Sequence, residues 1–401
     1  MTQLQDKKQI RNLGILLSVV YMVSYITRIN FGAIISEIER DTGIARSLLS
    51  MSVTGSFITY GAGQVVSGML GDRFSPKKLI CFGLGLTILM NTTIPFCTSP
   101  YAMLAAWCVN GFAQSLMWPP MVKIMAGLMS DQDYQKTVVT VSCGSSVGSI
   151  LVYLLSPVII AVFHWKAVFW ICAGCGGIML LIWHCFGMDV STKKQEKTQQ
   201  KQTAQYTLLF SPMMLSIMVA TMLQGMLRDG VTTWMPSYIS ETYNLSNIIS
   251  ILTGVCLPLF SILCFSLASR VYKSIFHNPV LCAGVIFGVG TAAALGVSLL
   301  SGRSAFASVL FSALLTGSMH GVNLMLVAMV PAYFKKTGNI STASGVVNAC
   351  TYVGSAISTY AIALLSEKAG WSVTLLLWIG IAALGAGLCF AVVKPWKQTM
   401  E

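Results

Sequence analysis

The chain contains twelve apolar segments, each long enough to cross a lipid bilayer. About 20 apolar residues in a helix, at 1.5 Å rise per residue, span the roughly 30 Å hydrocarbon core. Within a bilayer the backbone polar groups must be paired inside the protein, so spanning segments are helices or closed barrels. We therefore expect an all-α membrane protein with twelve transmembrane helices. The segments cover residues 13–35, 48–70, 79–97, 101–129, 137–163, 166–187, 208–239, 248–270, 277–301, 304–333, 341–366 and 370–393.

The composition and the placement of charge support this expectation. Of 401 residues, 55% are hydrophobic and only 9% are charged, whereas a soluble domain carries about 25% charged residues. Most of the 25 Lys and Arg residues fall on the side that is cytoplasmic if both termini lie inside. The net charge of +12 therefore indicates topology and attraction to membrane lipids, and we expect no nucleic-acid partner. These features predict a multi-pass protein of the cell inner (plasma) membrane with both termini cytoplasmic.

A polar stretch divides the segments into two sets of six. Residues 188–206 read as a solvated cytoplasmic linker that separates an N-terminal bundle, residues 1–187, from a C-terminal bundle, residues 207–401. Its lysines are Lys193, Lys194, Lys197 and Lys201. Two six-helix halves related by pseudo-twofold symmetry resemble the parallel repeats of the major facilitator superfamily, so we expect the major facilitator fold.

Two arginines interrupt apolar segments, and each lies in the first segment of its half: Arg28 and Arg228. An arginine at the centre of a bilayer costs about 2.5–3.5 kcal/mol on insertion scales, and it cannot escape the cost by losing its proton. Few carboxylates are available to neutralise the pair, which predicts a site for an anion. The alternative is that each arginine reaches an interface or pairs with a carboxylate. Asp229 is adjacent to Arg228, but neighbouring helical residues point about 100° apart, so a direct pair is not assured.

The sequence G-M-L-G-D-R-F-S-P-K-K follows the second segment, from Gly68 to Lys78. It resembles the signature loop between helices 2 and 3 of the superfamily. The resemblance implies a gating role for Gly68, Asp72 and Arg73. Glycine lets helices approach closely, and the charged side chains can pair with a helix end in one conformation only.

Four local matches narrow the resemblance: Y-I-T-R-I-N-F, G-D-R-F-S-P-K, N-G-F-A-Q-S-L-M-W-P-P and L-R-D-G-V-T-T-W-M-P-S-Y. Together they are similar to the organophosphate:phosphate antiporter family, and most of all to glycerol-3-phosphate and hexose-phosphate antiporters. That resemblance implies a secondary transporter in which Arg28 and Arg228 hold a phosphate moiety between the two halves during alternating access. A guanidinium fork fits a phosphate or carboxylate in bidentate fashion. Tyr25 and Trp118 lie inside the matched motifs and join the predicted substrate site.

The chain departs from this family at three positions. Gln64 stands where the phosphate exchangers carry a lysine, and Ser145 stands where the glycerol-3-phosphate branch carries a histidine. Thr253 replaces a glutamate that these exchangers carry in their eighth helix. These changes lower the charge of the predicted site. The expected partner is therefore a small organic anion, and a phosphate ester, a phosphonate and a carboxylate all remain open.

Two further residues complete the predicted substrate site. His320 lies deep in the tenth segment, where it is a substrate ligand, a proton carrier or a structural hydrogen-bonding group. Tyr352 is a polar candidate in the eleventh segment, although polar residues also join helices to each other. We expect a monomer without a cofactor or a metal; Cys172 and Cys175 form a C-x-x-C, but no His or third Cys accompanies them.

Two other functions remain open. A proton-coupled drug or metabolite exporter of the same superfamily would need intramembrane carboxylates, and Asp229 is the one candidate. A sugar-phosphate sensor would bind the anion without transporting it. An enzyme is not expected, because the sequence lacks a nucleophile–base or metal-ligand cluster.

Overall fold

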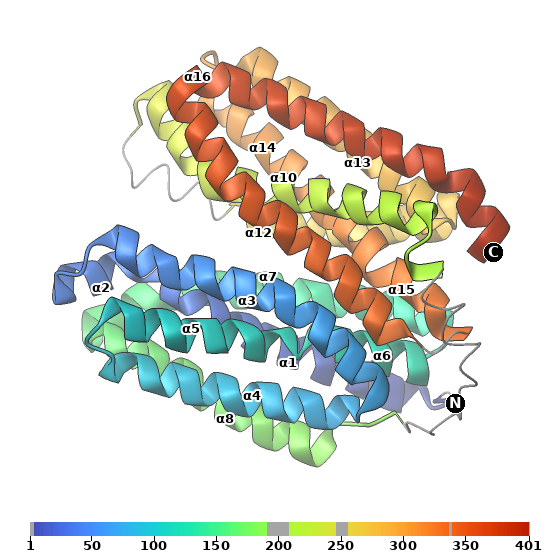
Figure 1. Cartoon of the computed structure of the whole chain (residues 1–401), viewed down its shortest axis with the longest axis horizontal. Helices are drawn as coiled ribbons and strands as arrows, with labels where there is room; N and C mark the ends of the chain where they lie inside the picture. The colour runs from blue at the N-terminus through green and yellow to red at the C-terminus, as the bar shows by residue number, and fades with distance from the viewer. Residues whose placement is uncertain (1–3, 191–207, 246–255, 337–338, 401) are drawn as a thin grey trace. The chain divides into compact units, whose positions relative to one another are not determined.

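The computed structural model describes residues 4–190, 208–245, 256–336 and 339–400, and its regular elements in these ranges are all helical (Figure 1). The first half contains α1 (Lys7–Ala33), α2 (Ile35–Thr42), α3 (Arg46–Arg73), α4 (Pro76–Thr93), η1 (Ile94–Phe96), α5 (Pro100–Ser115), α6 (Trp118–Leu128), α7 (Asp131–Val162) and α8 (Trp165–Phe186). The second half contains α10 (Pro212–Tyr243), α12 (Cys256–Val271), η2 (Tyr272–Phe276), α13 (Pro279–Leu300), α14 (Ala305–Asn323), η3 (Leu324–Met329), α15 (Val330–Ala332), η4 (Tyr333–Lys336) and α16 (Ile340–Met400). Thr253 and the four linker lysines lie outside the described residues.

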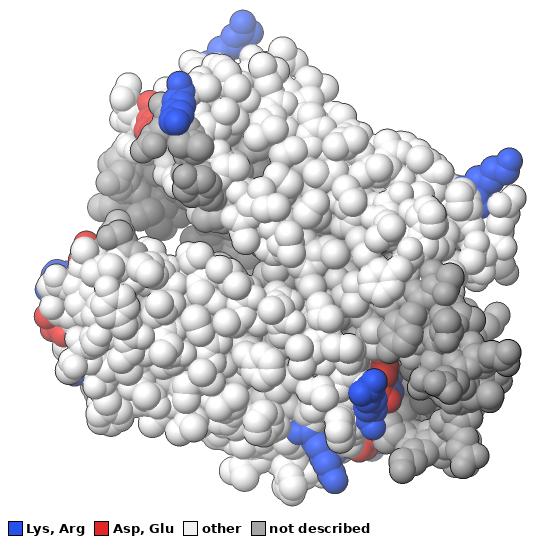
Figure 2. Space-filling model, in the orientation of Figure 1, with Lys and Arg blue, Asp and Glu red and all other residues white. Residues whose placement is uncertain are grey.

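The helical surfaces match a lipid environment. Eight of the described helices are long and apolar enough to cross a membrane under a strict criterion of length and hydropathy. Large apolar side chains are exposed along them, including Phe82, Leu181, Leu263 and Leu299. On the face drawn in Figure 2, Lys, Arg, Asp and Glu appear near the edges of the described surface, and uncharged side chains fill the space between.

Two expected segments are broken where the sequence disturbs helical hydrogen bonding. The fourth segment splits into α5 and α6 around Met117, directly before Trp118-Pro119-Pro120. Proline has no N–H to donate, so it is accepted at the first turn of α6 but not within a continuous helix. The tenth segment begins as α14 and widens into the π-helical η3 at Leu324, four residues after His320.

The last two segments run into one another as α16. They meet at Gly370, whose backbone is non-helical, with φ 76° and ψ 174°. This region is open mainly to glycine, because a side chain would collide with the backbone. The sequence therefore turns from one helix to the next without a separate loop.

By their contacts, the residues form two compact units. The first unit is Met1–Lys194 with Phe334–Ala349, and the second is Gln195–Tyr333 with Cys350–Glu401. The first part of α16 thus groups with the helices of the N-terminal half. The predicted domain boundaries at residues 187 and 207 remain a prediction.

The core of the first unit has an aromatic cluster near the ends of its helices. The rings of Phe31, Trp107 and Phe169 lie 5.1–5.9 Å apart between centroids, mostly in edge or tilted arrangements. Such geometries are favoured by the ring quadrupoles. Cys172 is buried in the same cluster, which agrees with a packing role for the C-x-x-C sequence.

Glycines bring particular helix pairs into close contact. A Cβ on Gly144 would lie 2.6 Å from the Ser18 carbonyl oxygen, and one on Gly148 would lie 2.5 Å from that of Met22. Both distances are shorter than real contacts allow, so only glycine lets α7 approach α1 this closely. The two glycines are spaced as G-x-x-x-G, a pattern typical of closely packed membrane helices. In the second unit, Gly225 of α10 meets the Thr351 carbonyl of α16 in the same way.

Candidate functional site

Arg28 lies inside the first unit among tyrosine rings. It is 8% exposed, and its guanidinium carbon lies 4.1 Å from the ring centroid of Tyr25 and 4.7 Å from that of Tyr60. A cation above an aromatic face is attracted to the negative side of the ring quadrupole. The structure therefore brings two predicted site residues, Arg28 and Tyr25, together. It adds Tyr60, which the sequence alone did not distinguish from a packing residue.

An aromatic row connects this arginine to α6. Tyr21 lies 5.1 Å from Tyr25 and 5.1 Å from Trp118, between ring centroids. Trp118 is 4% exposed, and its buried indole Nε1 has no hydrogen-bond partner among the described residues. Buried donors are normally paired. The indole N–H is thus a group that can donate to an acceptor on a ligand.

Buried polar side chains fix the rotation of α1 around Arg28. Gln114 Nε2 donates to Thr27 Oγ1 at 2.9 Å, and Gln114 Oε1 accepts from Ser24 Oγ at 2.6 Å. Asn30 Nδ2 donates to Asn91 Oδ1 at 2.8 Å. Each of these bonds joins α1 to α4 or α5 in the protein interior, where leaving a polar group unpaired costs about 1–3 kcal/mol. Rotating α1 would break the network, so Arg28 is held toward the tyrosines.

Gln64 is fully buried and is held from two sides. Its Nε2 donates to the Ser115 carbonyl at 3.3 Å, and its Oε1 accepts from Asn348 Nδ2 of α16 at 3.0 Å. Ser145 also is buried, and its hydroxyl donates to the Ser142 carbonyl at 2.6 Å within its own helix. Both substituted positions therefore carry neutral side chains whose hydrogen bonds connect protein groups.

Arg228 is paired with Asp229 in the second unit. Its Nε lies 2.7 Å from Oδ1 and its Nη2 lies 2.8 Å from Oδ2, so the carboxylate occupies one edge of the guanidinium. Ser355 Oγ of α16 lies 2.5 Å from Asp229 Oδ2. The direct pair that the sequence left uncertain is present. Asp229 therefore neutralises one of the two arginines through a bidentate pair.

Two more predicted residues surround this pair. The Tyr352 ring lies 5.7 Å from the guanidinium carbon of Arg228. His320 of α14 packs edge-on against Phe265, 5.3 Å between centroids, and it interacts electrostatically with both Arg228 and Asp229. The second unit thus assembles Arg228, His320 and Tyr352 around a carboxylate. Ser355 is a member of this site that the sequence analysis missed, because serines are common in membrane helices and nothing in its local sequence sets it apart.

The predicted gating residues meet the start of α16. Asp72 accepts the backbone N–H groups of Ser341 at 3.2 Å and Thr342 at 2.8 Å. A carboxylate in this position satisfies unpaired amides and complements the positive end of the helix dipole. A Cβ on Gly68 would lie 2.7 Å from the Ser341 carbonyl oxygen. Arg73, by contrast, is exposed at the last position of α3.

Lys123 is a further buried charge at this place. It is 4% exposed, and its Nζ donates to the carbonyl oxygens of Gly71 at 2.7 Å and Asp72 at 3.2 Å. The same Nζ lies 3.8 Å from Asp72 Oδ1. The overall distribution of Lys and Arg does not set Lys123 apart. Its position within the apolar fourth segment is the feature of the sequence that could have indicated a buried role.

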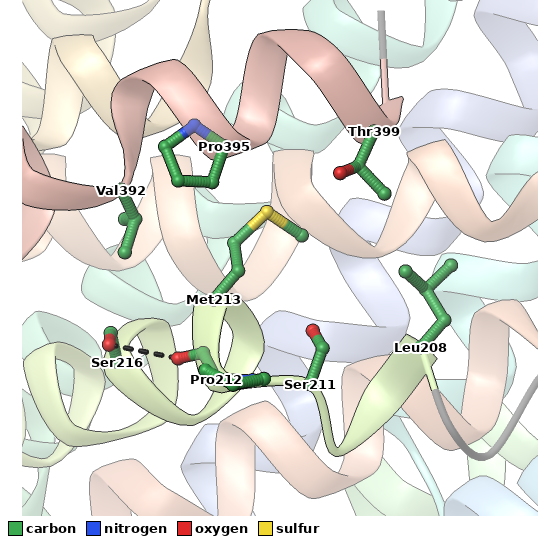
Figure 3. Close-up of a pocket in the computed structure, with 8 residues that line it drawn as sticks. All are labelled: Leu208, Ser211, Pro212, Met213, Ser216, Val392, Pro395 and Thr399. Atoms are coloured by element: carbon green, nitrogen blue, oxygen red, sulfur yellow. Dashed lines mark hydrogen bonds between the residues drawn. The ribbon is translucent and has the colours of Figure 1, made fainter.

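A pocket of about 350 Å³ opens elsewhere in the second unit, between the start of α10 and the end of α16 (Figure 3). Its lining contains no charged side chain and consists of Leu208, Ser211, Pro212, Met213, Ser216, Val392, Pro395 and Thr399. Ser216 donates its hydroxyl hydrogen to the Pro212 carbonyl at 2.9 Å, as drawn. Without a cation this pocket does not suit an anion, so the two arginine environments are the better candidates.

The described geometry provides two different cationic groups. Arg28 is a buried cation in contact with aromatic rings, a setting that accepts a negatively charged group and packs an organic body. Arg228 is a cation whose charge is balanced by its neighbour, with Asp229 exposed at 32% of its side chain. At Arg228 an anion competes with this carboxylate for the guanidinium.

Comparisons with known proteins agree with the motifs. A family model described as Major Facilitator Superfamily matches residues 17–324. The chain is 23% identical to the membrane sensor protein UhpC of Escherichia coli over 394 residues, which cover 91% of this chain and 88% of UhpC. It is 22% identical to the probable hexose phosphate transport protein of Chlamydia muridarum over 390 residues, covering 88% and 84% of the two chains.

A solved structure supports the fold. The crystal structure of the human organic anion transporter MFSD10 (TETRAN) superimposes with a TM-score of 0.76 and covers 95% of this chain and 99% of that one. The sequence identity is 14%. At this level the likeness concerns the fold alone, and it confirms the predicted twelve-helix architecture.

Proposed function

Because the chain belongs to the major facilitator superfamily, we propose that it is a secondary active transporter of a small organic anion, most simply a phosphorylated metabolite. The family and the fold are those of membrane transporters. Transport would proceed by alternating access, through exchange with phosphate or coupling to an ion. The relatives named for hexose phosphate transport and the motifs of the organophosphate:phosphate antiporters support this substrate class.

The observation on which the proposal depends is a buried arginine in each unit. Arg28 and Arg228 are 8% and 9% exposed, and each lies beside tyrosine rings. A buried cation is costly unless it serves a partner, and intramembrane charges typically belong to substrate or ion pathways. We assign Arg28 and Arg228 as the anion-binding residues. Tyr25, Gln64, Trp118, Ser145, His320 and Tyr352 form the remaining proposed substrate site.

The charge around the arginines bears on the substrate. Asp229 balances Arg228, and Gln64 and Ser145 are neutral. The proposed site therefore offers less positive charge than two unpaired arginines would. This favours an anion with a single negative charge on its binding group, such as a monoanionic phosphate ester, a phosphonate or a carboxylate.

The remaining features support a transport cycle in a membrane. We propose a location in the cell inner membrane with both termini cytoplasmic, on the basis of the Lys and Arg distribution. Gly68, Asp72 and Arg73 are assigned as gating residues. The contact of Asp72 with Ser341 and Thr342 is a charge-to-helix-end pairing that can form in one conformation and open in another.

Counterflow in proteoliposomes tests the proposal. Purified protein is reconstituted into vesicles loaded with phosphate, and uptake of labelled phosphate is measured against a panel of unlabelled organic phosphates, phosphonates and carboxylates. We expect saturable counterflow that some members of the panel inhibit. Wild-type protein that is folded and inserted but gives no counterflow with any anion would contradict transport of this substrate class.

A second candidate function is a non-transporting sugar-phosphate sensor. It is favoured by one observation, the similarity to UhpC along most of both chains. The same assay separates the two functions, because a sensor binds its ligand without sustained flux. Saturable binding to the purified protein, together with absent counterflow, would support the sensor.

A further inference from the structure

We propose that Asp229 is a proton-binding site that couples anion transport to proton movement. In this scheme the carboxylate pairs with Arg228 before the anion binds, and it takes up one proton when the anion replaces it on the guanidinium. The inference rests on the proposed function, because it concerns how the same arginine receives its anion. It adds a second transported species, the proton, and a residue that carries it.

Asp229 occupies the donors of Arg228 that an anion would need. Asp229 uses both oxygens on the edge of Arg228 formed by Nε and Nη2, at 2.7 and 2.8 Å. A phosphate or carboxylate would seek the same kind of paired donors. The internal carboxylate is therefore a competitor for the fork that an anionic substrate requires.

An ionised Asp229 would repel an anion bound at Arg228. An anion that approached Arg228 while Asp229 stayed ionised would bring two negative charges together in a low-dielectric environment, where such repulsion is strong. One proton on Asp229 removes it. The local charge is then the same before and after binding: Arg⁺ with Asp⁻ becomes Arg⁺ with the anion and a neutral carboxyl. In this scheme one proton is taken up for each monoanion bound.

Ser355 allows Asp229 to exist in either form. Its Oγ lies 2.5 Å from Asp229 Oδ2 and 2.9 Å from the Thr351 carbonyl oxygen. A hydroxyl can donate or accept by rotating its hydrogen. With Asp229 ionised, Ser355 donates to the carboxylate. With Asp229 protonated, the carboxyl O–H can donate to Ser355 Oγ while the serine hydrogen turns to Thr351, so both states keep a hydrogen bond.

The Asp229 side chain is 32% exposed, compared with 11% for Arg228. The titratable or charged groups facing it within the described residues are Arg228 on α10, His320 on α14 and Tyr352 on α16. Tyr352 titrates far above neutral pH in ordinary surroundings. His320 is therefore the competing candidate for the proton, and the experiment must separate it from Asp229.

Binding of the two species is then linked. By thermodynamic reciprocity, a proton on Asp229 raises the affinity for the anion by the same factor as the anion raises the affinity for the proton. In the pH range where Asp229 must be protonated for binding, the apparent anion affinity rises about tenfold for each unit that the pH falls. A transmembrane pH gradient can consequently drive accumulation of the anion.

The test uses full-length protein in vesicles with labelled inorganic phosphate as the probe. Uptake is measured as counterflow at equal pH on both sides, over a pH series, and as accumulation under an inward proton gradient of one pH unit. For the wild type we expect a pH-dependent apparent affinity and accumulation several-fold above the level reached after a protonophore collapses the gradient. Asp229→Asn should lose the gradient-driven accumulation and flatten the pH dependence.

Matched variants control for a general loss of folding or activity. They also control for the titration of the phosphate probe, because that titration is the same in every assay. Glu241→Gln makes the same chemical change at a carboxylate that accepts a bond from Trp371 Nε1 at 2.7 Å, and it should behave as the wild type. His320 belongs to the proposed substrate site, so His320→Gln is judged by the ratio of accumulation with the proton gradient to accumulation without it. That ratio should stay at the wild-type value even where counterflow falls. Asp229→Glu keeps an ionisable group and should retain part of it.

The outcomes separate the two proposals. Wild-type protein without counterflow contradicts the proposed function itself. Wild-type counterflow with no response to the gradient, or Asp229→Asn with the wild-type response, overturns only the coupling role. A His320→Gln variant that keeps counterflow but loses the response to the gradient assigns the proton to histidine and also overturns it. If Asp229→Asn does not fold, the response of His320→Gln decides, because its persistence leaves Asp229 as the titrating group.

Discussion

The Asn348 amide donates a hydrogen bond to Gln64 Oε1 at 3.0 Å, joining α16 to α3 within the first unit. Both side chains are buried, so neither can exchange this partner for water. The Gln64 position is also one at which the chain departs from the antiporter motifs. A residue expected to act on substrate charge is thus also part of the helix packing.

Gln64→Ala should destabilise the protein. The substitution removes the acceptor for Asn348 and the donor to the Ser115 carbonyl, leaving two buried groups unpaired. An unpaired buried group costs about 1–3 kcal/mol. Thermal unfolding of the purified protein measures the effect. Equal melting temperatures for wild type and Gln64→Ala would refute the structural role.

Arg28→Lys should reduce counterflow by about tenfold or more, which corresponds to about 1.4 kcal/mol. A lysine keeps the charge but loses the planar fork and the broad contact with the Tyr25 and Tyr60 rings. Arg228→Lys should have a comparable effect. The assay is initial-rate counterflow at matched protein content. A double-mutant cycle decides whether the two arginines act on one bound anion, since independent sites would give additive losses of free energy. Unchanged counterflow in both single variants would contradict the assignment of the two arginines as anion-binding residues.

Asp72→Asn should weaken the contact with the first turn of α16. The amide retains one acceptor oxygen but loses the charge that complements two backbone N–H groups and the helix dipole. We expect a loss of roughly 1 kcal/mol in stability, together with an altered transport rate. Asp131→Asn is the control, because Asp131 is 91% exposed and lies 3.9 Å from Lys335, and exposed pairs contribute little. Equal effects of the two substitutions would argue against a special role for Asp72.

Gly225→Ala should destabilise the α10–α16 contact by about 1–3 kcal/mol, because its Cβ would collide with the Thr351 carbonyl. The same contact places Asp229 beside Ser355, so counterflow should fall as well. Gly380→Ala makes the same change in open space and should be neutral or slightly stabilising, as alanine favours a helix. Differential scanning fluorimetry in detergent compares the two variants. Similar melting temperatures would mean that the helices can move apart at little cost.

The last turn of α2 should contribute a pH-dependent part of the stability. Asp41 accepts hydrogen bonds from Trp165 Nε1 at 2.8 Å and His164 Nε2 at 3.1 Å, and these bonds, that of Trp165 foremost, hold the pKa of Asp41 below its usual value of 3.8. The lowered pKa means that the stabilisation is present above pH 3.8 and is lost as the pH falls through the folded-state value. Melting temperatures of wild type and Asp41→Asn should therefore differ at neutral pH and converge in strong acid. A difference that persists in acid would exclude the carboxylate as its source.

The fold was largely predictable from the sequence, and the reasons are specific. Apolar length identified the membrane segments, and Pro119 and Pro120 marked the place where α5 gives way to α6. The break between the eleventh and twelfth segments, expected at residues 366–370, coincides with the turn at Gly370. The grouping of Phe334–Ala349 with the N-terminal helices depends on tertiary contacts that no local pattern reports.

The site was predictable in its cations but less so in their partners. Isolated arginines in apolar segments are conspicuous because their insertion is costly. The sequence did not decide whether Asp229 pairs with Arg228. Adjacent residues in an ideal helix point in different directions, but their flexible side chains can still form an ion pair, as they do here. Ser355 and Lys123 acquire their roles only from residues distant in the chain.

The division of α16 has a consequence for experiments with separated halves. Asp72 and Gln64 find their α16 partners in residues 341–348, which belong to the opposite end of the polypeptide from the helices they join. A fragment truncated within the linker would expose these two acceptors and the close-packed surface of Gly68. Complementation by co-expressed halves should accordingly depend on whether the second fragment retains the first turns of α16. With a second fragment that begins at residue 350, the first half would lack the partners of Asp72 and Gln64 in its interior.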